Sequence, residues 1–290
     1  MLLHERKTYM RIITDSAADF TREELSRHQV SCVPMQVIFG KESISAHALE
    51  SDAFWNRLLS GEIAKTSQPS PDAFLTEFES AQDAGEDVIY IGVSSSLSGT
   101  LQSATIASSM TDRSSVRIVD TLSGTAGQKL LALHACRLRD EGRLTAREIA
   151  QELTSLRSRI HIYASLDTLE NLARSGRISR TAASIGTLAQ LKPLVTLNPQ
   201  TNGHIEVCGK AIGRHRAIDA VVRQIAKHAI DERFPVIPIY SYCPDNCAAL
   251  IKKLKAAGIS VSEDMLCALG PTLSTHIGPH AYGVAFIAAQ

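Results

Sequence analysis

The 290-residue sequence lacks an excess of either charge, since it has 30 Lys and Arg residues and 30 Asp and Glu residues. This balance argues against a nucleic-acid-binding protein, which normally carries a basic excess or patch, and against attraction to an acidic membrane surface. No apolar run approaches the roughly 20 residues that span a bilayer. The first ten residues contain no apolar core of a signal peptide, so we expect a short N-terminal extension, no transmembrane segment and a cytoplasmic protein.

The signatures of common metal, nucleotide and hydrolase sites are also missing. The six cysteines form no C-x-x-C pair, and no paired carboxylates stand at a metal-binding spacing. The chain contains neither G-x-x-x-x-G-K-[ST] nor G-x-G-x-x-G, the usual nucleotide loops. It also has no G-x-S-x-G nucleophile elbow. We therefore expect reduced, mostly structural thiols, no metal and no cofactor.

The first half of the chain alternates strand-like and helix-like segments. Apolar runs predict strands at 10–14, 30–39, 88–93 and 116–119. Helical spacing, capping boxes and a Ser-Pro start predict helices from 21 and at 50–59, 71–84, 100–110, 127–141 and 145–157. Strands that alternate with helices of this length indicate βαβ units and a mostly parallel sheet.

Past residue 158 the pattern changes to short strand candidates with fewer helices between them. Strands are predicted at 160–165, 194–197, 204–208, 236–240 and 284–288, and helices at 216–228 and 245–257. We therefore predict an N-terminal α/β domain over 1–158 and a C-terminal α+β domain over 159–290. The fold class is α/β, with helices flanking the parallel sheet of the first domain.

One Ser-rich segment, Gly92-Val93-Ser94-Ser95-Ser96-Leu97-Ser98-Gly99-Thr100, separates a predicted strand from a predicted helix. Unpaired backbone N–H groups at the helix start, the helix dipole and several hydroxyls together suit a phosphate or a carboxylate. An ordinary helix N-cap followed by solvated turn residues explains the same run of Ser and Gly residues equally well.

Two more hydroxyl-rich turns, Thr14-Asp15-Ser16 and Thr66-Ser67, are expected to join this segment. Ligands of open parallel sheets bind outside the carboxyl ends of the strands, where we place all three turns. Asp15 either orients neighbouring hydroxyls or caps the next turn. Thr66 and Ser67 precede a predicted helix, so ordinary turn chemistry competes with a binding role.

The second half offers cations and a histidine. Arg174 and Arg177 flank a Gly turn that continues to Ser179, and Arg214 lies in the basic turn Gly213-Arg214-His215-Arg216. Guanidinium groups suit phosphate or carboxylate, although single arginines are usually solvated. His276, before a Gly-Pro turn, is a candidate for proton transfer, anion contact or a structural role. From the residues alone, the chain is an anion-binding two-domain protein with its ligand left open.

The sequence resembles the DegV family, and the motifs that match the family occur in the same order as in the family, from about residue 10 to the end. They are Thr14-Asp15-Ser16, Thr66-Ser67-Gln68-Pro69-Ser70, Ser94-Ser95-x-Leu97-Ser98-Gly99-Thr100 with Gln102-Ser103-Ala104, Leu169-x-x-Leu172-x-x-x-Gly176-Arg177-Ile178-Ser179, Lys192-Pro193, and His276-x-Gly278-Pro279-x-Ala281.

The resemblance implies a protein that holds a long-chain fatty acid, such as palmitate, stearate or oleate, in a buried tunnel between its two domains. It implies that hydroxyls of the Thr66-Ser67 turn and the Ser98-Gly99-Thr100 loop hold the carboxylate, with Thr66 and Ser98 foremost. Arg177, Arg214 and His276 match positions expected near that carboxylate or at a docking face. The family's bacterial carriers are not enzymes themselves. They present the carboxylate to a separate ATP-binding fatty acid kinase subunit, which makes an acyl phosphate for phospholipid synthesis.

Two departures from the family pattern limit what the resemblance implies, and the second of them bears on recognition of the kinase partner. The Tyr-x-Asp segment after the second strand is absent, and residues 39–47 read Phe-Gly-Lys-Glu-Ser-Ile-Ser-Ala-His. Ile212 stands in the basic turn where an Arg is usual. Two alternatives stay open: an esterase or acyltransferase with Ser98 as nucleophile and His276 as base, and a binder of another anionic metabolite.

Overall fold

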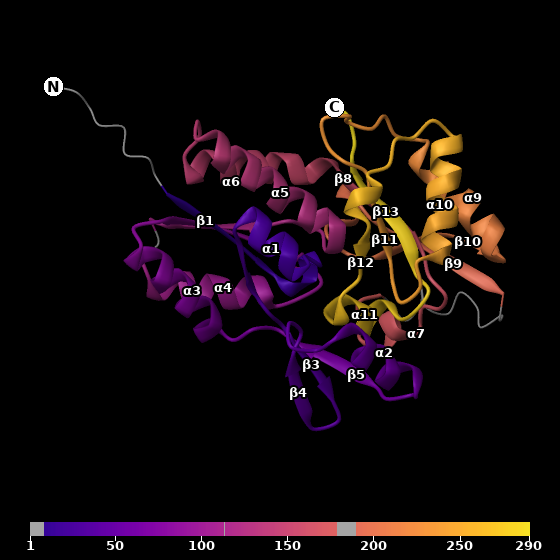
Figure 1. The fold of residues 1–290 in the computed structure, drawn as a ribbon, viewed down its shortest axis with the longest axis horizontal. Helices are drawn as coiled ribbons and strands as arrows, with labels where there is room; N and C mark the ends of the chain where they lie inside the picture. Colours follow the sequence, from indigo (N-terminus) through magenta and orange to yellow (C-terminus); the bar gives the residue numbers. More distant parts are fainter. Residues whose placement is uncertain (1–8, 113, 179–189) are drawn as a thin grey trace.

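A four-stranded parallel sheet forms the centre of the N-terminal half. The computed structural model describes residues 9–112, 114–178 and 190–290 (Figure 1). The sheet has the strand order β2-β1-β6-β7, and every neighbouring pair in it is parallel. Its strands are β1 (Met10–Asp15), β2 (Val30–Val33), β6 (Asp87–Gly92) and β7 (Val116–Asp120). The apolar run of β6 is buried on both faces, as expected for the interior of a parallel sheet.

Helices cover both faces of this sheet. Ile13 and Tyr90 pack with α3 (Pro71–Asp83) and α4 (Thr100–Met110), whereas Ile12 and Ile91 point to the opposite face. That opposite face is covered by α5 (Thr125–Glu141) and α6 (Ala146–Leu156). Figure 1 shows these two helix layers on either side of β1. Next to the sheet lie η1 (Ser16–Ala18) and α1 (Arg22–His28).

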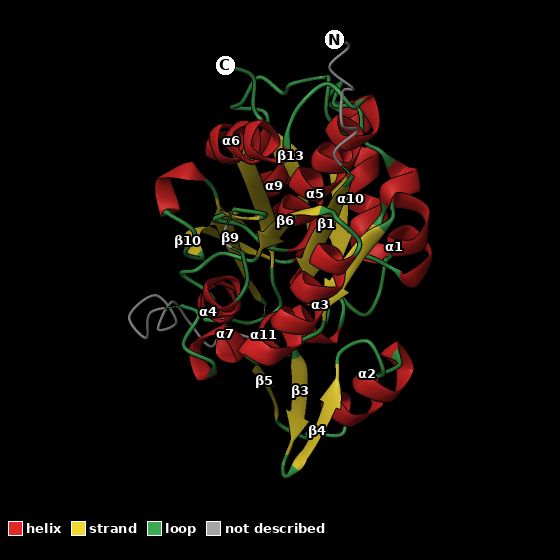
Figure 2. Cartoon of the chain, turned by 90° about the vertical axis from the view of Figure 1, so that its left-hand side faces the viewer, coloured by secondary structure: helices red, strands yellow, loops and turns green. Residues whose placement is uncertain are grey.

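A small antiparallel sheet projects from the parallel one, at the bottom of Figure 2. It has the order β4-β3-β5 and carries α2 (Ser51–Leu59). Its strands are β3 (Gln36–Phe39), β4 (Glu42–Ser45) and β5 (Ala64–Ser67). The predicted strand at 30–39 is therefore two strands in two different sheets, because Pro34, which lies between β2 and β3, has no N–H group with which to continue a strand ladder.

The second half forms a six-stranded sheet with the order β10-β9-β8-β13-β11-β12. All neighbouring pairs are antiparallel except β11 and β12. The strands are β8 (Ile160–Ser165), β9 (Leu191–Leu197), β10 (Glu206–Ile212), β11 (Ile237–Tyr240), β12 (Cys267–Ala268) and β13 (Tyr282–Ile287). The predicted α/β fold with a sheet-rich second part is confirmed.

The helices of the second half lie on both faces of the six-stranded sheet. They are α7 (Glu170–Arg174), α9 (Arg214–Ile225), α10 (Asp245–Ala256) and α11 (Pro271–Ile277), with short turns η2 (Arg157–Arg159), η3 (Pro199–Thr201) and η4 (Glu263–Met265). Sequence periodicity did not predict β12, α7 or α11, which are all short. In the part of the chain that the structure describes, no helix is both long and apolar enough to cross a membrane.

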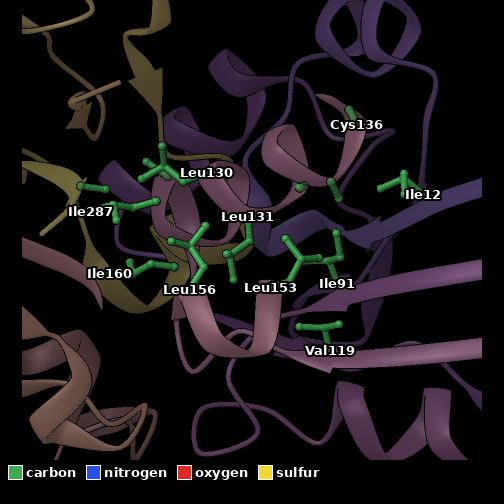
Figure 3. Close-up of a cluster of buried hydrophobic side chains, with 14 of the residues drawn as sticks. Ile12, Ile91, Val119, Leu130, Leu131, Cys136, Leu153, Leu156, Ile160 and Ile287 are labelled. Atoms are coloured by element: carbon green, nitrogen blue, oxygen red, sulfur yellow. The ribbon is translucent and has the colours of Figure 1, made fainter. Parts of the chain in front are cut away.

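The two large sheets share one apolar core through α5 and α6. Figure 3 shows Ile91 and Val119 of the parallel sheet near Leu153, and Ile287 of the six-stranded sheet near Leu130, within one cluster of buried side chains. Burial of this apolar surface, at about 25 cal/mol per Å², fixes the relative position of the sheets on this side of the molecule. Elsewhere, hydrogen bonds between polar residues join the same two halves of the chain.

Candidate functional site

Thr66 and His276 meet although they are 210 positions apart in the chain, with 2.8 Å between Thr66 Oγ1 and His276 Nε2. Thr66 lies in β5, and α11 carries His276 and packs against β5. The predicted placement of Thr66 and Ser67 in a turn at the parallel sheet is wrong, because both residues pair with β3 in the small antiparallel sheet. A strand this short and polar depends on its distant partner, which periodicity cannot reveal.

The second ring nitrogen of His276, Nδ1, is buried and has no hydrogen-bond partner among the described residues. The side chain is 9% exposed. Burial, reinforced by the positive charge of Arg177, lowers the pKa of His276 to about 4. The ring is therefore neutral near pH 7. An unsatisfied buried polar group of this kind costs about 1–3 kcal/mol, which a ligand that forms the missing hydrogen bond would recover.

Ser98, Gly99 and Thr100 form the start of α4. Ser98 Oγ lies 2.7 Å from Thr100 Oγ1 and accepts a hydrogen bond from Thr100 N at 3.3 Å. Ser98 is half-buried and Thr100 is buried. Gly99 occupies the N-cap position, where no side chain caps the helix. The Ser98 hydroxyl therefore contacts the helix start from the residue before the N-cap, and α4 still presents N–H groups there.

Arg177, directly after α7, connects this loop with His276. Its Nε donates a hydrogen bond to Leu97 O at 3.2 Å, and its charge acts on His276. The contact places a guanidinium group beside the residue that precedes Ser98. Ser179, which belongs to the same motif, lies outside the described residues.

Gln68 is a further residue of the site to which the sequence assigned no role. Its Nε2 donates to Ser103 Oγ at 2.9 Å, and a Cβ atom added at Gly99 would lie 2.1 Å from its Oε1. Glycine at position 99 therefore lets Gln68 pack directly on the loop backbone. The signal was present in the sequence, since Gln68 stands inside the Thr66–Ser70 motif.

Two predicted site residues, Ser67 and Arg214, do not join the group around His276. Ser67 is exposed and follows Thr66 in a strand, so its side chain points to the opposite face of the sheet. Arg214 is exposed at the start of α9 and lines a separate cavity of about 340 Å³ together with Lys192 and Tyr282.

The other serines of the Ser-rich segment hold neighbouring loops. Ser94 Oγ donates to Gly203 O at 2.9 Å, and Ser96 Oγ donates to Asn202 O, also at 2.9 Å. Ser95 Oγ donates to Asp120 Oδ2 at 2.6 Å. The hydroxyls of Ser98 and Thr100 pair with each other at the start of α4, whereas the other three hydroxyls of the segment bond to neighbouring parts of the chain.

The turn after β1 also has a structural role. Asp15 accepts hydrogen bonds from Ala17 N at 2.9 Å, Tyr90 Oη at 2.7 Å and Val93 N at 2.9 Å. Burial raises the pKa of this carboxyl group, and these hydrogen bonds oppose the rise. Ser16 Oγ contacts Thr272 Oγ1 at 2.9 Å. The turn therefore caps η1 and supports α11, and Asp15 does not orient the hydroxyls of the site.

The geometry suits anion binding better than nucleophilic catalysis. The hydroxyl of Ser98 is paired with Thr100, and the Nε2 of His276 is paired with Thr66, so the two do not form a nucleophile–base pair. A carboxylate can accept hydrogen bonds from hydroxyls, backbone N–H groups, imidazole and guanidinium. Within the ranges described, no cluster of three or more His, Cys, Asp or Glu residues is arranged to hold a metal.

The chain also matches one protein family over nearly its whole length. The family model described as "Uncharacterised protein, DegV family" matches residues 9–289. A DegV domain-containing protein of Lactococcus lactis is 31% identical over 274 residues, covering 92% of this chain and 93% of its own length. A DegV domain-containing protein of Staphylococcus aureus is 30% identical over 274 residues and covers 94% and 96% of the two chains.

Solved structures with the same fold include proteins that bind fatty acids. The structure reported as fatty acid binding of a DegV family protein from Thermus thermophilus has a TM-score of 0.86 and 28% identity, and it covers 97% of this chain and 100% of its own. The crystal structure of DegV, a fatty acid binding protein from Bacillus subtilis, has a TM-score of 0.81 and 26% identity with the same coverage.

Proposed function

The chain belongs to the DegV family, and we propose that it binds a long-chain fatty acid such as palmitate, stearate or oleate. In this proposal Thr66, Ser98 and His276 hold the carboxylate, the N–H groups at the start of α4 add donors, and Arg177 supplies a positive charge. Ser67, Gly99 and Thr100 support these groups as their neighbours. The fold is that of DegV proteins known to bind fatty acids.

The observation that carries the proposal is the unpaired, buried Nδ1 of His276 beside the Thr66 hydroxyl. If Thr66 donates to Nε2, the neutral ring carries its proton on Nδ1, and that proton needs an acceptor. A carboxylate oxygen is such an acceptor and carries the charge that the helix start and Arg177 favour. A metabolite with another anionic group would meet the same donors, but it would make no use of the apolar residues nearby.

Those apolar residues lie around α7 and α11. A buried cluster of Leu166, Leu169, Leu172, Ile178, Val195 and Ala281 has Ile277, the neighbour of His276, packed against it. We place the acyl chain along this cluster, between the two halves of the protein. Each buried CH₂ group contributes about 0.8 kcal/mol, so an acyl chain of ordinary length would supply most of the affinity.

The wider role that we propose is that of a cytoplasmic carrier, not itself an enzyme, which presents the carboxylate to an ATP-binding kinase subunit for acyl-phosphate formation. The family resemblance supports this step. Arg214 and Ile212 are both exposed at the end of β10 and the start of α9, so they belong to a surface that a partner can reach. Ile212 would change the charge of that surface relative to the family pattern.

The binding proposal is tested by native mass spectrometry of the protein purified from a bacterial host, followed by titration with oleate and palmitate. We expect a co-purified fatty acid. The Thr66→Ala and Ser98→Ala variants should each bind at least about tenfold more weakly, since a hydrogen bond to a charged group is worth about 1.5–3 kcal/mol.

The matched control is Thr105→Ala, because Thr105 is an exposed threonine of α4 that bonds Leu101 O. Its affinity should equal that of the unmodified protein. A protein that carries no lipid and also fails to bind added oleate or palmitate would refute the proposal. Unchanged affinity in the Thr66→Ala/Ser98→Ala double variant would refute the assigned carboxylate site.

A further inference from the structure

The start of helix α11 is held by residues from the other half of the chain. The helix is seven residues long, carries His276 in its last turn and begins after Gly270, which has no side chain to cap it. A helix this short is not stable by itself in water, so neighbouring groups must fix its position. Asp19 Oδ1 accepts a hydrogen bond from Gly270 N at 2.9 Å across 251 positions, and Ser16 Oγ lies 2.9 Å from Thr272 Oγ1. The turn η1 therefore sets the place where α11 begins.

Asp19 is the residue that ends η1, and its side chain joins three elements. Its backbone is left-handed, with φ of 53°, a conformation that residues other than glycine seldom adopt. A Cβ atom added at Gly270 would lie 3.2 Å from Asp19 Oδ1, so the glycine lets the carboxyl group approach the start of α11 closely. The Thr125 hydroxyl, at the start of α5, also stabilises the ionised carboxyl group. One buried side chain thus connects η1, α5 and α11.

Three titratable groups face Asp19 from other elements. Lys129 of α5 attracts its charge, Asp15 of β1 repels it, and the Cys267 thiol of β12 lies 4.0 Å from its backbone oxygen. Lys129 is itself paired with Glu24 of α1 at 2.8 Å. Burial raises the pKa of Cys267 to about 12. Although burial opposes both shifts, their mutual hydrogen bond lowers the pKa of Glu24 and helps to raise that of Lys129. These three groups therefore keep their protonation states between pH 6 and pH 8.

Asp19 differs from them because it changes charge near neutral pH. Burial raises its pKa to about 7, although Thr125, Gly270 and Lys129 oppose the rise. A hydrogen bond to an ionised carboxyl group is about twice as strong as one to a neutral group. The bond from Gly270 N to Asp19 is therefore firmest above pH 7.

We propose that Asp19 is a positioning residue of the carboxylate site: its side chain fixes the start of α11 and thereby places His276, at the other end of that helix, beside Thr66. The step from the helix to a ligand rests on the proposed function, in which His276 holds a fatty acid carboxylate. The firm bond to Gly270 strengthens binding above pH 7, whereas direct repulsion by the Asp19 charge would weaken it. Asp19 and the ligand would stand at opposite ends of α11, so we expect the hydrogen bond to dominate.

The test compares Asp19→Asn with the unmodified full chain in oleate titrations at pH 6 and pH 8. Asn has nearly the shape of Asp but no charge, and any change in the ionisation of oleate affects both proteins alike. At pH 8 the variant should bind about fivefold more weakly, which is the difference between a charged and a neutral hydrogen bond. At pH 6 the two proteins should bind about equally.

Urea denaturation at pH 8 separates positioning from folding. The folded-state pKa of Asp19 lies above its ordinary value of 3.8, so this group lowers stability as the pH rises from its ordinary pKa to about 7. Asp19→Asn avoids that loss and should be at least as stable as the unmodified protein at pH 8, while it binds oleate more weakly. A variant that loses both stability and affinity at pH 8 would overturn the inference in favour of a purely structural role.

The matched control is Thr272→Val, which removes the other hydrogen bond to the start of α11. Thr272 is buried and contacts Ser16, and neither residue titrates in this range. Any loss of affinity in this variant should be the same at pH 6 and pH 8. A loss confined to pH 8, as expected for Asp19→Asn, would overturn the assignment of the pH dependence to Asp19, and so would an Asp19→Asn variant that binds equally weakly at both pH values.

A measurement without ligand keeps the inference separate from the proposed function. In the ligand-free protein, the NMR signals of the His276 ring, identified with His276→Gln, should shift in Asp19→Asn at pH 8 and stay in place at pH 6. If neither protein binds oleate, the fatty acid proposal fails, and this shift alone still supports the positioning of His276 by Asp19. An unmoved ring signal at pH 8 would overturn the inference. Tighter oleate binding by Asp19→Asn at pH 8 would also overturn it, in favour of direct repulsion.

Discussion

The tripeptide Ser-Gly-Thr occurs twice in this protein, at 98–100 and at 123–125, and the comparison separates a site from a packing motif. Each copy follows a strand of the parallel sheet, β6 or β7, and each begins a helix, α4 or α5. Ser98 is half-buried and pairs with Thr100. Ser123 is 2% exposed and its hydroxyl has no partner among the described residues.

The difference lies in what packs against each helix start. The groups near Ser98 are polar. Arg177 donates a hydrogen bond to Leu97 O, and the Gln68 side chain packs against Gly99. Ser123 lies against Gly127, and the apolar side chains of Ile160 and Ile162 approach the same glycine, because α5 is buried between the two large sheets. The same three residues therefore provide hydroxyls beside polar groups in one place and a tight helix–sheet contact in the other.

The largest effect should come from tightening the second turn with Gly127→Ala. The new Cβ would lie 2.2 Å from Ser123 Oγ and 3.1 Å from both Ile160 Cγ2 and Ile162 Cδ1. Overpacking of this kind costs about 1–3 kcal/mol of the free energy of unfolding, measured by urea denaturation. Fatty acid affinity should stay the same.

The double variant Gly127→Ala/Ser123→Ala is the control for this steric account. It removes the closest contact and should recover part of the lost stability. If the double variant is no more stable than Gly127→Ala alone, the contact between the two positions is not the cause.

An effect of comparable size at pH 4, and a smaller one closer to neutral pH, is expected from the protonation of His276 near the first turn. The folded-state pKa is about 4 and the ordinary value is 6.5, so the unfolded chain takes up a proton first as the pH falls. Stability should therefore decrease between pH 6.5 and pH 4, by on the order of 1 kcal/mol per pH unit below the ordinary value.

His276→Gln should flatten this part of the pH profile in chemical denaturation. His161, whose pKa burial also lowers to about 4, provides the comparison. Saturation with oleate should reduce the pH dependence due to His276 and leave that due to His161 unchanged, because a carboxylate stabilises the protonated ring of His276. An equal response of the two histidines to oleate would contradict the assigned site.

The smallest effect on stability is expected for Gly99→Ala in the first turn. The new Cβ would meet Gln68 Oε1 at 2.1 Å, but that atom ends a flexible, exposed side chain that can move. We expect a loss of less than about 0.5 kcal/mol in stability, the usual range for such surface changes. Fatty acid affinity should nevertheless fall several-fold, because the displaced Gln68 amide loses its hydrogen bond to Ser103 and its packing on the loop that carries Ser98.

Adding Gln68→Ala to Gly99→Ala should restore much of the affinity in the same oleate titration. A restored affinity would show that the loop position matters and the glycine itself does not. The opposite result, an affinity as low as in Gly99→Ala, would place the effect in the backbone of residue 99.

Elements with local signals were predictable to within a few residues. The capping boxes Thr21–Glu24 and Thr145–Glu148 are both formed and begin α1 and α6, and the predicted helix at 100–110 coincides with α4. The elements that the sequence did not reveal, among them β5 and α11, are short and held by distant partners. Thr66 of β5 pairs with Val37 and contacts His276.

The candidate site, too, could be predicted only as far as local sequence motifs reveal it. The motifs around Thr66, Ser98, Arg177 and His276 could be read directly, because each is a short run of residues with a fixed spacing. How these residues lie relative to one another could not be predicted. Arg214 stands in an equally clear motif, but in the structure it lines a separate cavity together with Tyr282. The sequence of a basic turn does not indicate which surface of the folded protein it will face.

By itself the sequence determined the alternation of strands and helices, the caps, and the presence of hydroxyl-rich helix starts. These depend on hydrogen bonds and periodicities within a few residues of one another. Only the tertiary structure decided which of the two Ser-Gly-Thr turns faces a polar site and which is packed under apolar side chains. The reason is physical: burial and electrostatics depend on residues that are distant in the chain, and packing alone brings those residues together.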